Sequence, residues 1–277
     1  MSRVTEIRYV GYGVKDLAAE QAFYVDQWGL EQIPSDDGMI WFKAAGHDEH
    51  HVVRLRAADE NRIDVVALAA DSRADVDALY AKVEASGAKL VNAPQDLSTP
   101  GGGYGFRFFT PDGLQFEISS DVARGSRREI ARWEGVPVKI SHIVFHSPDH
   151  QAFVKWFVDV LGFKVSDWLG DFMGFLRCNS AHHRIAILPG PPCLNHVAYD
   201  MPDVDEMMRG IVRHQRVRGR QPQVAAGQRE LEVHLAQPIR QADVAQCQSV
   251  GYWPQRSVVQ RHEGGGQFGR RHVDRSE

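Results

Sequence analysis

The sequence of 277 residues carries one pattern twice, and this repeat constrains the fold more than any other feature. The matching positions lie 132 or 133 residues apart: Tyr9 with His142, Gly29 with Gly162, and the pair His50–His51 with His182–His183. Asp64 matches His196 at an offset of 132. A register that holds over most of the second copy indicates a duplicated module. Where the copies differ, one of them has gained or lost a site.

Each copy opens with alternating β-branched and aromatic residues, which predict strands at 7–14 and 139–146. A helix follows each strand, capped by Asp16 in the first copy and by Ser147 in the second. Further short strands are expected at 39–44, 52–55 and 63–69, and at 172–178, 184–188 and 194–199. The first copy continues with a helix at 74–86 and a hairpin at 104–119. We therefore expect an α+β fold of repeated βαβββ modules in two domains, the second incomplete.

The second copy keeps this register only to about residue 211. Residues 212–277 hold 11 Arg, no Lys and six acidic residues, whereas the preceding 211 residues carry a net charge of −9. No clear periodicity follows, although Leu231, Val233 and Leu235 predict one short strand. The expected segments are a first domain at 1–120, a connector at 121–137, a truncated second domain at 138–211 and a poorly ordered tail at 212–277.

Composition argues against two classes of partner. No apolar run approaches the ~18 residues of a membrane span, and the N-terminal residues do not have the pattern of a signal segment. The sequence therefore predicts a cytoplasmic protein without a membrane partner. The net charge of −4 argues against nucleic acid, and the arginine-rich segments of the tail show no regular interleaving with aromatic residues.

Three motifs of the second copy stand in an informative order: 139–148 around His142, 176–186 around His183 and 194–199 around His196. In these motifs the chain resembles the type I extradiol ring-cleaving dioxygenases of the vicinal oxygen chelate superfamily, over about residues 4–211. The resemblance implies paired modules that curl into an open barrel, and a first domain without metal. It also implies Fe(II), less often Mn(II), in the second domain, and assembly as a homo-oligomer.

By the same resemblance, His142 and His196 are metal ligands and His183 is the acid/base residue. Two histidines and one carboxylate bind Fe(II) on one face and leave the opposite positions open, here for a catechol and O2. A nearby histidine can accept a proton from the substrate and return it later. The implied reaction inserts both atoms of O2 beside the two hydroxyls of a catechol, in aromatic catabolism.

The third ligand of that family is a Glu on the last strand of the second domain. The first copy has Glu117 there, after the turn at 111–113. The offsets of 128 to 133 place its counterpart at 245–250, which contain no Asp or Glu. The carboxylate is therefore missing in register, and it stays open whether this chain binds metal and is active.

Two explanations of the tail stay open. Residues 212–277 are a divergent terminus, or the reading frame has shifted near 209–212; the abrupt loss of Lys favours the frameshift. The function has alternatives as well: a small-ligand binding protein of the same superfamily without oxygenase activity, or a glyoxalase-like metalloenzyme. The two-domain length and the His182–His183 motif favour the oxygenase over the glyoxalase-like enzyme.

Overall fold

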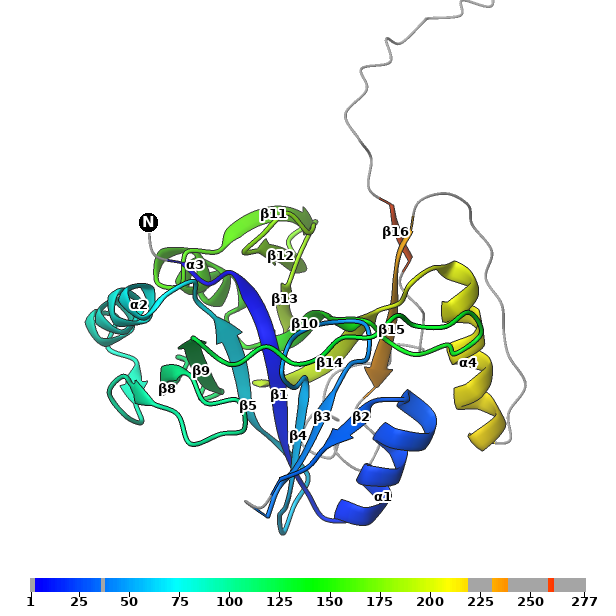
Figure 1. Ribbon diagram of the computed structural model, residues 1–277. Coiled ribbons are helices and arrows are strands. Elements are labelled where there is room, and N and C mark those ends of the chain that lie inside the picture. Colours follow the sequence, from blue (N-terminus) through cyan, green and yellow to red (C-terminus); the bar gives the residue numbers. More distant parts are fainter. Residues whose placement is uncertain (1–2, 36–37, 219–230, 239–258, 262–277) are drawn as a thin grey trace, which may run out of the picture.

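The computed structural model describes residues 3–35, 38–218, 231–238 and 259–261, and beyond residue 213 it describes helices and strands only. Two sheets lie side by side, with β1 next to β10 (Figure 1). The strands of the first sheet are β1 (Glu6–Val14), β2 (Glu31–Ile33), β3 (Ile40–Lys43), β4 (Val53–Ala57), β5 (Arg62–Ala69), β6 (Lys89–Leu90), β7 (Gln95–Asp96), β8 (Tyr104–Phe109) and β9 (Gln115–Ser120). Its helical segments are α1 (Leu17–Ala22), η1 (Phe23–Trp28) and α2 (Arg73–Ala85).

The first sheet has the order β2-β3-β4-β1-β5-β9-β8-β6, with β7 paired to β8. β1 runs parallel to β4, β5 runs parallel to β9, and β1 and β5 meet antiparallel at the centre. The order is therefore that of two βαβββ units joined through their first strands. This arrangement confirms the fold class that the repeat predicts.

The second sheet begins in the same way. Its strands are β10 (Lys139–Ser147), β11 (Lys164–Leu169), β12 (Met173–Arg177), β13 (Ile185–Pro189), β14 (Cys193–Asp200), β15 (Leu231–Pro238) and β16 (Val259–Arg261), and its helices are α3 (His150–Asp159) and α4 (Val204–Arg218). The strand order is β11-β12-β13-β10-β14-β15-β16, with β10 parallel to β13 and antiparallel to β14.

The second sheet departs from the first beyond β14. In the first sheet the neighbour of β5 on that side is β9, which runs parallel to it and carries Glu117. In the second sheet the neighbour of β14 is β15, which runs antiparallel. β15 confirms the short strand predicted around Val233. The predicted disorder of the tail falls mostly on residues outside the described part of the chain.

Of the two predicted helix N-caps, one is confirmed and one is wrong. Asp16 caps α1 by accepting a hydrogen bond from the Ala19 amide at 2.9 Å, as predicted. The cap of α3 is Asp149, which accepts from the Ala152 amide at 3.0 Å, and not Ser147. Ser147 is instead the last residue of β10, because that strand extends one residue further than the alternation suggested.

Alternation along the strands separates two environments. On one face of β10, Ile143 and Phe145 join a large core with α3 and with aromatic residues of the first sheet; the Phe116 and Phe145 ring centroids lie 5.8 Å apart. On the other face lie His142 and Val144, as Tyr9 does in the first sheet. The helices therefore cover one face of each sheet and leave the opposite face for a site.

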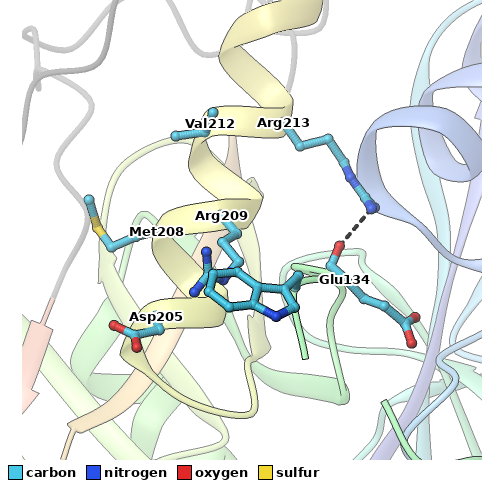
Figure 2. A pocket seen from close by; sticks show the side chains of 7 residues that line it. Glu134, Asp205, Met208, Arg209, Val212 and Arg213 are labelled. Carbon is cyan, nitrogen blue, oxygen red and sulfur yellow. Dashed lines mark hydrogen bonds between the residues drawn. The ribbon is translucent and has the colours of Figure 1, made fainter. Parts of the chain in front are cut away.

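The connector packs on α4 (Figure 2). The Glu206 carboxylate accepts hydrogen bonds from the Trp133 amide at 2.7 Å and the Gly135 amide at 2.6 Å. The Arg209 guanidinium lies 3.6 Å from the Trp133 ring centroid, and Arg213 donates to the Glu134 carbonyl at 2.6 Å. The boundary predicted at 211–212 thus falls inside a helix that continues to residue 218. Among the described residues no helix is both long and apolar enough to span a membrane.

Candidate metal and acid/base site

His142 and His196 lie on adjacent antiparallel strands and face each other. Their Nε2 atoms are 3.3 Å apart, although the residues are separated by 54 positions in the chain. β10 supplies His142, which is opposite Ala198, and β14 supplies His196, which is opposite Val144. The two predicted ligands are therefore brought together by the pairing of these strands.

His183 joins them from the segment just before β13. Its ring centroid is 4.3 Å from that of His142, and both residues are 6% exposed. The Nδ1 atoms of His182 and His183 are 3.2 Å apart, and the Phe175 ring packs 5.1 Å from the His183 ring. The structure thus places all three predicted histidines in one cluster.

The spacing of the two facing histidine nitrogens is compatible with a shared metal ion. Imidazole nitrogens at roughly 2.1 Å from one ion are about 3.0 to 3.4 Å apart for angles between octahedral and tetrahedral. The observed Nε2 separation of 3.3 Å falls in that range. Among the described residues, however, no group of three or more His, Cys, Asp or Glu side chains is arranged to hold a metal. Any third ligand to a metal held by these two histidines would come from substrate, water or residues outside the described part of the chain.

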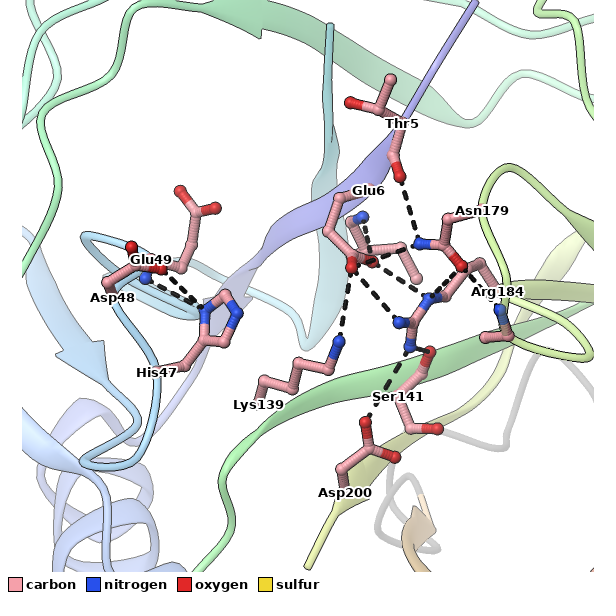
Figure 3. Close-up of polar contacts among 12 residues, drawn as sticks. Thr5, Glu6, His47, Asp48, Glu49, Lys139, Ser141, Asn179, Arg184 and Asp200 are labelled. Carbon is pink, nitrogen blue, oxygen red and sulfur yellow. Dashed lines mark hydrogen bonds and ion pairs between the residues drawn. The ribbon is translucent and has the colours of Figure 1, made fainter. Parts of the chain in front are cut away.

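An ionic cluster anchors the second sheet to the first beside these histidines (Figure 3). Arg184 follows His183 and is 6% exposed; its Nη1 donates to the Ser141 carbonyl at 2.7 Å, next to His142. Its Nε lies 3.1 Å from Glu6 Oε1, on β1 of the first sheet. The backbone on both sides of the cluster is therefore tied to the first module, and sequence patterns gave no sign of this contact.

The first module has a different set of side chains in the matching place. The Tyr9 hydroxyl lies 3.2 Å from Glu117 Oε2, and Arg107 Nη2 lies 2.7 Å from the same oxygen. Burial, followed by the Glu117 charge, raises the pKa of Tyr9 far above its ordinary value, so it stays a neutral donor. Burial, followed by nearby cationic groups, lowers the pKa of His51 to about 3. This set is a buried packing network.

Strand pairing corrects the match between Asp64 and His196. Opposite Gly11 of β1 stands Val65, and Asp64 falls in a bulge; opposite Val144 of β10 stands His196, and Asn195 falls in the corresponding bulge. The structural offset between β5 and β14 is therefore 131, not 132, whereas that between β1 and β10 stays 133. His196 corresponds to Val65, and Asp64 corresponds to Asn195.

Asp64 has its own role in the first module. Its carboxylate is within hydrogen-bonding distance of Arg54, at 3.0 Å, and of Arg56 and Arg62. Burial opposes ionisation, but the hydrogen bond from Arg56 and the charges of Arg54 and Arg56 lower the pKa of Asp64 below its ordinary value. Asp64 is thus held as a structural anion.

Comparisons with known proteins identify the relatives of this chain. Residues 6–118 match the family model of the Glyoxalase/Bleomycin resistance protein/Dioxygenase superfamily. A manganese-dependent 2,3-dihydroxybiphenyl 1,2-dioxygenase from Geobacillus genomosp. 3 is 25% identical over 207 residues, which are 68% of this chain and 65% of that protein. A biphenyl-2,3-diol 1,2-dioxygenase from Paraburkholderia xenovorans is 26% identical over 224 residues, 74% of each chain. The chain thus spans less than two thirds of the length of the first of these relatives.

A solved structure is also similar to this chain. The Mn(II)-bound glyoxalase from Novosphingobium aromaticivorans is 70% identical, has a TM-score of 0.77, and is matched over 84% of this chain and 73% of that chain. Its description and that of the Geobacillus enzyme both name manganese, which supports a divalent metal in these relatives without singling out iron. These relatives confirm the resemblance that the three histidine motifs predict. The chain belongs to the Glyoxalase/Bleomycin resistance protein/Dioxygenase superfamily.

Proposed function

We propose that this protein is a metal-dependent extradiol dioxygenase that opens the ring of a catechol with O2. The observation that carries the proposal is the convergence of His142 and His196 on one point, with the His183 ring beside them. The curated relatives named above are described as dioxygenases acting on dihydroxybiphenyl. In this proposal residues 1–120 form the metal-free domain, residues 138–211 supply the site, and the protein is a cytoplasmic homo-oligomer.

The metal belongs to the proposal, with Fe(II) first and Mn(II) second. His142 and His196 would hold it through Nε2. The bound ion would supply charge transfer between a catecholate and O2, and Lewis-acid activation of the hydroxyl groups. Open positions opposite two histidines suit a ligand with two neighbouring oxygens, and this is the feature that favours a catechol.

His183 handles the proton in this proposal. Its Nδ1 is within hydrogen-bonding distance of His182, so we assign proton transfer to Nε2. A neutral His183 would accept the proton of a catechol hydroxyl and return it to the oxygen that develops charge during ring opening. Burial of His142 and His183 keeps water away from the reacting atoms.

The test is reconstitution of the full chain without oxygen, with Fe(II) or Mn(II) in separate samples. Bound metal is measured after gel filtration, and catechol and O2 are then added. We expect about one metal per chain and a coloured ring-opened product. His183→Ala should retain the metal and lose the product, whereas His150→Ala, which changes a half-buried histidine at the start of α3, should behave as the parent. Retained metal without coloured product from any catechol would contradict the proposal.

A second candidate is glyoxalase activity, because the relative that is 70% identical is described as a glyoxalase. The same reconstituted protein should then convert a 2-oxoaldehyde in the presence of a thiol. The two candidates require the same histidine ligands and differ in their dependence on O2. Turnover that continues under argon would therefore favour the glyoxalase.

A further inference from the structure

A chain of hydrogen bonds leads away from His196 to a backbone carbonyl. His196 Nδ1 lies 2.6 Å from Asn195 Oδ1, and Asn195 Nδ2 lies 2.6 Å from His146 Nε2. His146 Nδ1 lies 3.1 Å from the Pro189 carbonyl oxygen. The chain thus crosses from β14 to β10 and ends on β13.

The direction of every hydrogen bond in this chain follows from its last member. A carbonyl oxygen only accepts, so His146 Nδ1 carries a hydrogen and donates it to Pro189. In neutral His146 the other nitrogen, Nε2, is then an acceptor, and the Asn195 amide group donates to it. Asn195 therefore presents its oxygen to His196, whose Nδ1 must donate.

A hydrogen on Nδ1 of His196 determines the state of its other nitrogen, Nε2. A neutral imidazole with a hydrogen on Nδ1 has its lone pair on Nε2, the atom that faces His142 at 3.3 Å. When no metal is present, a hydrogen on His142 Nε2 can be donated to this lone pair. The nitrogen that faces the site is therefore ready to bind a metal.

The position of His146 is built into the fold. Gly190 follows β13, and its amide donates a hydrogen bond to the Ser147 carbonyl at 3.0 Å. A Cβ at Gly190 would lie only 2.5 Å from His146 Nδ1, so any other residue would push the ring away from Pro189. The bulge at Asn195 supplies the extra residue that lets its side chain lie beside that of His196. The first module has no such chain, because Gly13 and Asp64 occupy the matching positions.

We propose that Asn195 and His146 are positioning residues that hold His196 with its hydrogen on Nδ1, so that Nε2 is a preformed metal ligand. The proposal rests on the assignment of His196 as a ligand in the proposed function. Groups bonded to the outer nitrogen of a ligand histidine typically change metal affinity by about 10- to 100-fold. His146 acts on His196 only through Asn195, which makes the chain testable at two places.

The direct test is nitrogen NMR of histidine rings in the metal-free full-length protein at a pH where they are neutral. His196, assigned by comparison with a His196→Gln variant, should show a protonated Nδ1 and an unprotonated Nε2. Asn195→Leu should shift this signal towards a mixture of the two forms. Asn195→Asp should keep it, because a carboxylate oxygen can still accept from Nδ1. His150→Ala is the matched control and should leave the signal unchanged.

A second measurement uses Mn(II) titration followed by calorimetry. We expect Asn195→Leu and His146→Phe to weaken binding by about 10-fold or more, and Asn195→Asp to recover most of the loss. Gly190→Ala, which displaces His146 without touching Asn195, should weaken binding in the same direction. An unchanged His196 signal and unchanged Mn(II) affinity in Asn195→Leu would overturn the proposal.

The two proposals fail separately. The NMR measurement needs neither metal nor turnover, so an inactive protein whose His196 signal shifts in Asn195→Leu keeps the positioning role and loses only the dioxygenase. A protein that cleaves catechol while the His196 signal is indifferent to Asn195 keeps the dioxygenase and loses the positioning role.

Discussion

The two modules share a central pair of strands with the same two bulges, β1 with β5 and β10 with β14, but these strands present different side chains. In the first, the position of His142 is taken by Tyr9, which contacts Glu117, and the position of His196 is taken by Val65, which packs against Tyr9. In the second, the histidines are present, and β15 lies where the first module has the strand of Glu117. In the described part of the chain, the first module presents the carboxylate of Glu117 and the second presents the two histidines. The same strand arrangement therefore supports either set of side chains.

Supporting residues changed together with the site. Asp64 sits in a bulge among three arginines, whereas Asn195 in the same bulge bridges two histidines. The Asp64 carboxylate binds arginines and so ties neighbouring strands together. The Asn195 amide has both a donor and an acceptor, so it can fix the orientation of one histidine ring relative to the other. The residue in the bulge therefore distinguishes the two modules as clearly as Val65 and His196 do.

The largest expected effect is a loss of metal affinity when the second module is changed but not when the first is changed. His142→Ala removes one of two histidine donors and should weaken Mn(II) or Fe(II) binding by more than about 100-fold, beyond the loss typical of outer-shell changes. Tyr9→Phe, the matched change in the first module, should leave metal affinity unchanged. Calorimetric titration of both variants checks this. Equal losses in the two variants would show that the first module takes part in the site.

A gain of function tests the corrected register. Tyr9→His with Val65→His places two histidines near Glu117 and should create a second metal site, raising the bound Mn(II) to about two per chain. Tyr9→His with Asp64→His follows the offset of 132 and should not, because Asp64 lies in the bulge. Equilibrium dialysis measures the stoichiometry. We expect weak binding, at least tenfold weaker than a complete site, since Arg107 competes for Glu117.

Much of this architecture could be predicted from sequence, and the failures have a common cause. The repeat of Tyr9 and Gly29 gave the two modules, and periodicity of two gave the strands that carry His142 and His196. The match of Asp64 was wrong by one residue because a bulge adds a position to one strand and leaves no trace in the alternation. The contact between His146 and Asn195 could not be predicted, because the two residues are 49 positions apart in the chain. The direction of β15 likewise depends on tertiary pairing alone.

The buried histidine of the first module predicts a smaller, pH-dependent effect. The pKa of His51 is about 3 in the folded state and near 6.5 when exposed, so unfolding takes up a proton between these values. The stabilisation is complete above pH 6.5 and is lost as the pH falls towards 3. Between pH 6.5 and 5 this amounts to about 2 kcal/mol. Urea unfolding should show this slope in the parent and a flatter one in His51→Gln; identical slopes would contradict it.

The smallest expected effect concerns the contact that joins the modules (Figure 3). Glu6 Oε2 lies 3.2 Å from Arg184 Nη2, 3.4 Å from Lys139 Nζ and 3.3 Å from Asn179 Nδ2. Glu6→Gln removes the charge while preserving size, and Arg184 retains the Ser141 carbonyl at 2.7 Å, so we expect a loss of about 1 kcal/mol. The control Lys155→Gln removes an exposed pair with Asp159 and should cost less than about 0.5 kcal/mol. Urea midpoints at constant slope measure both variants. If Glu6→Gln costs no more than Lys155→Gln, the ionic cluster does not stabilise the junction, and the shared aromatic core around Phe116 and Phe145 must hold the modules together.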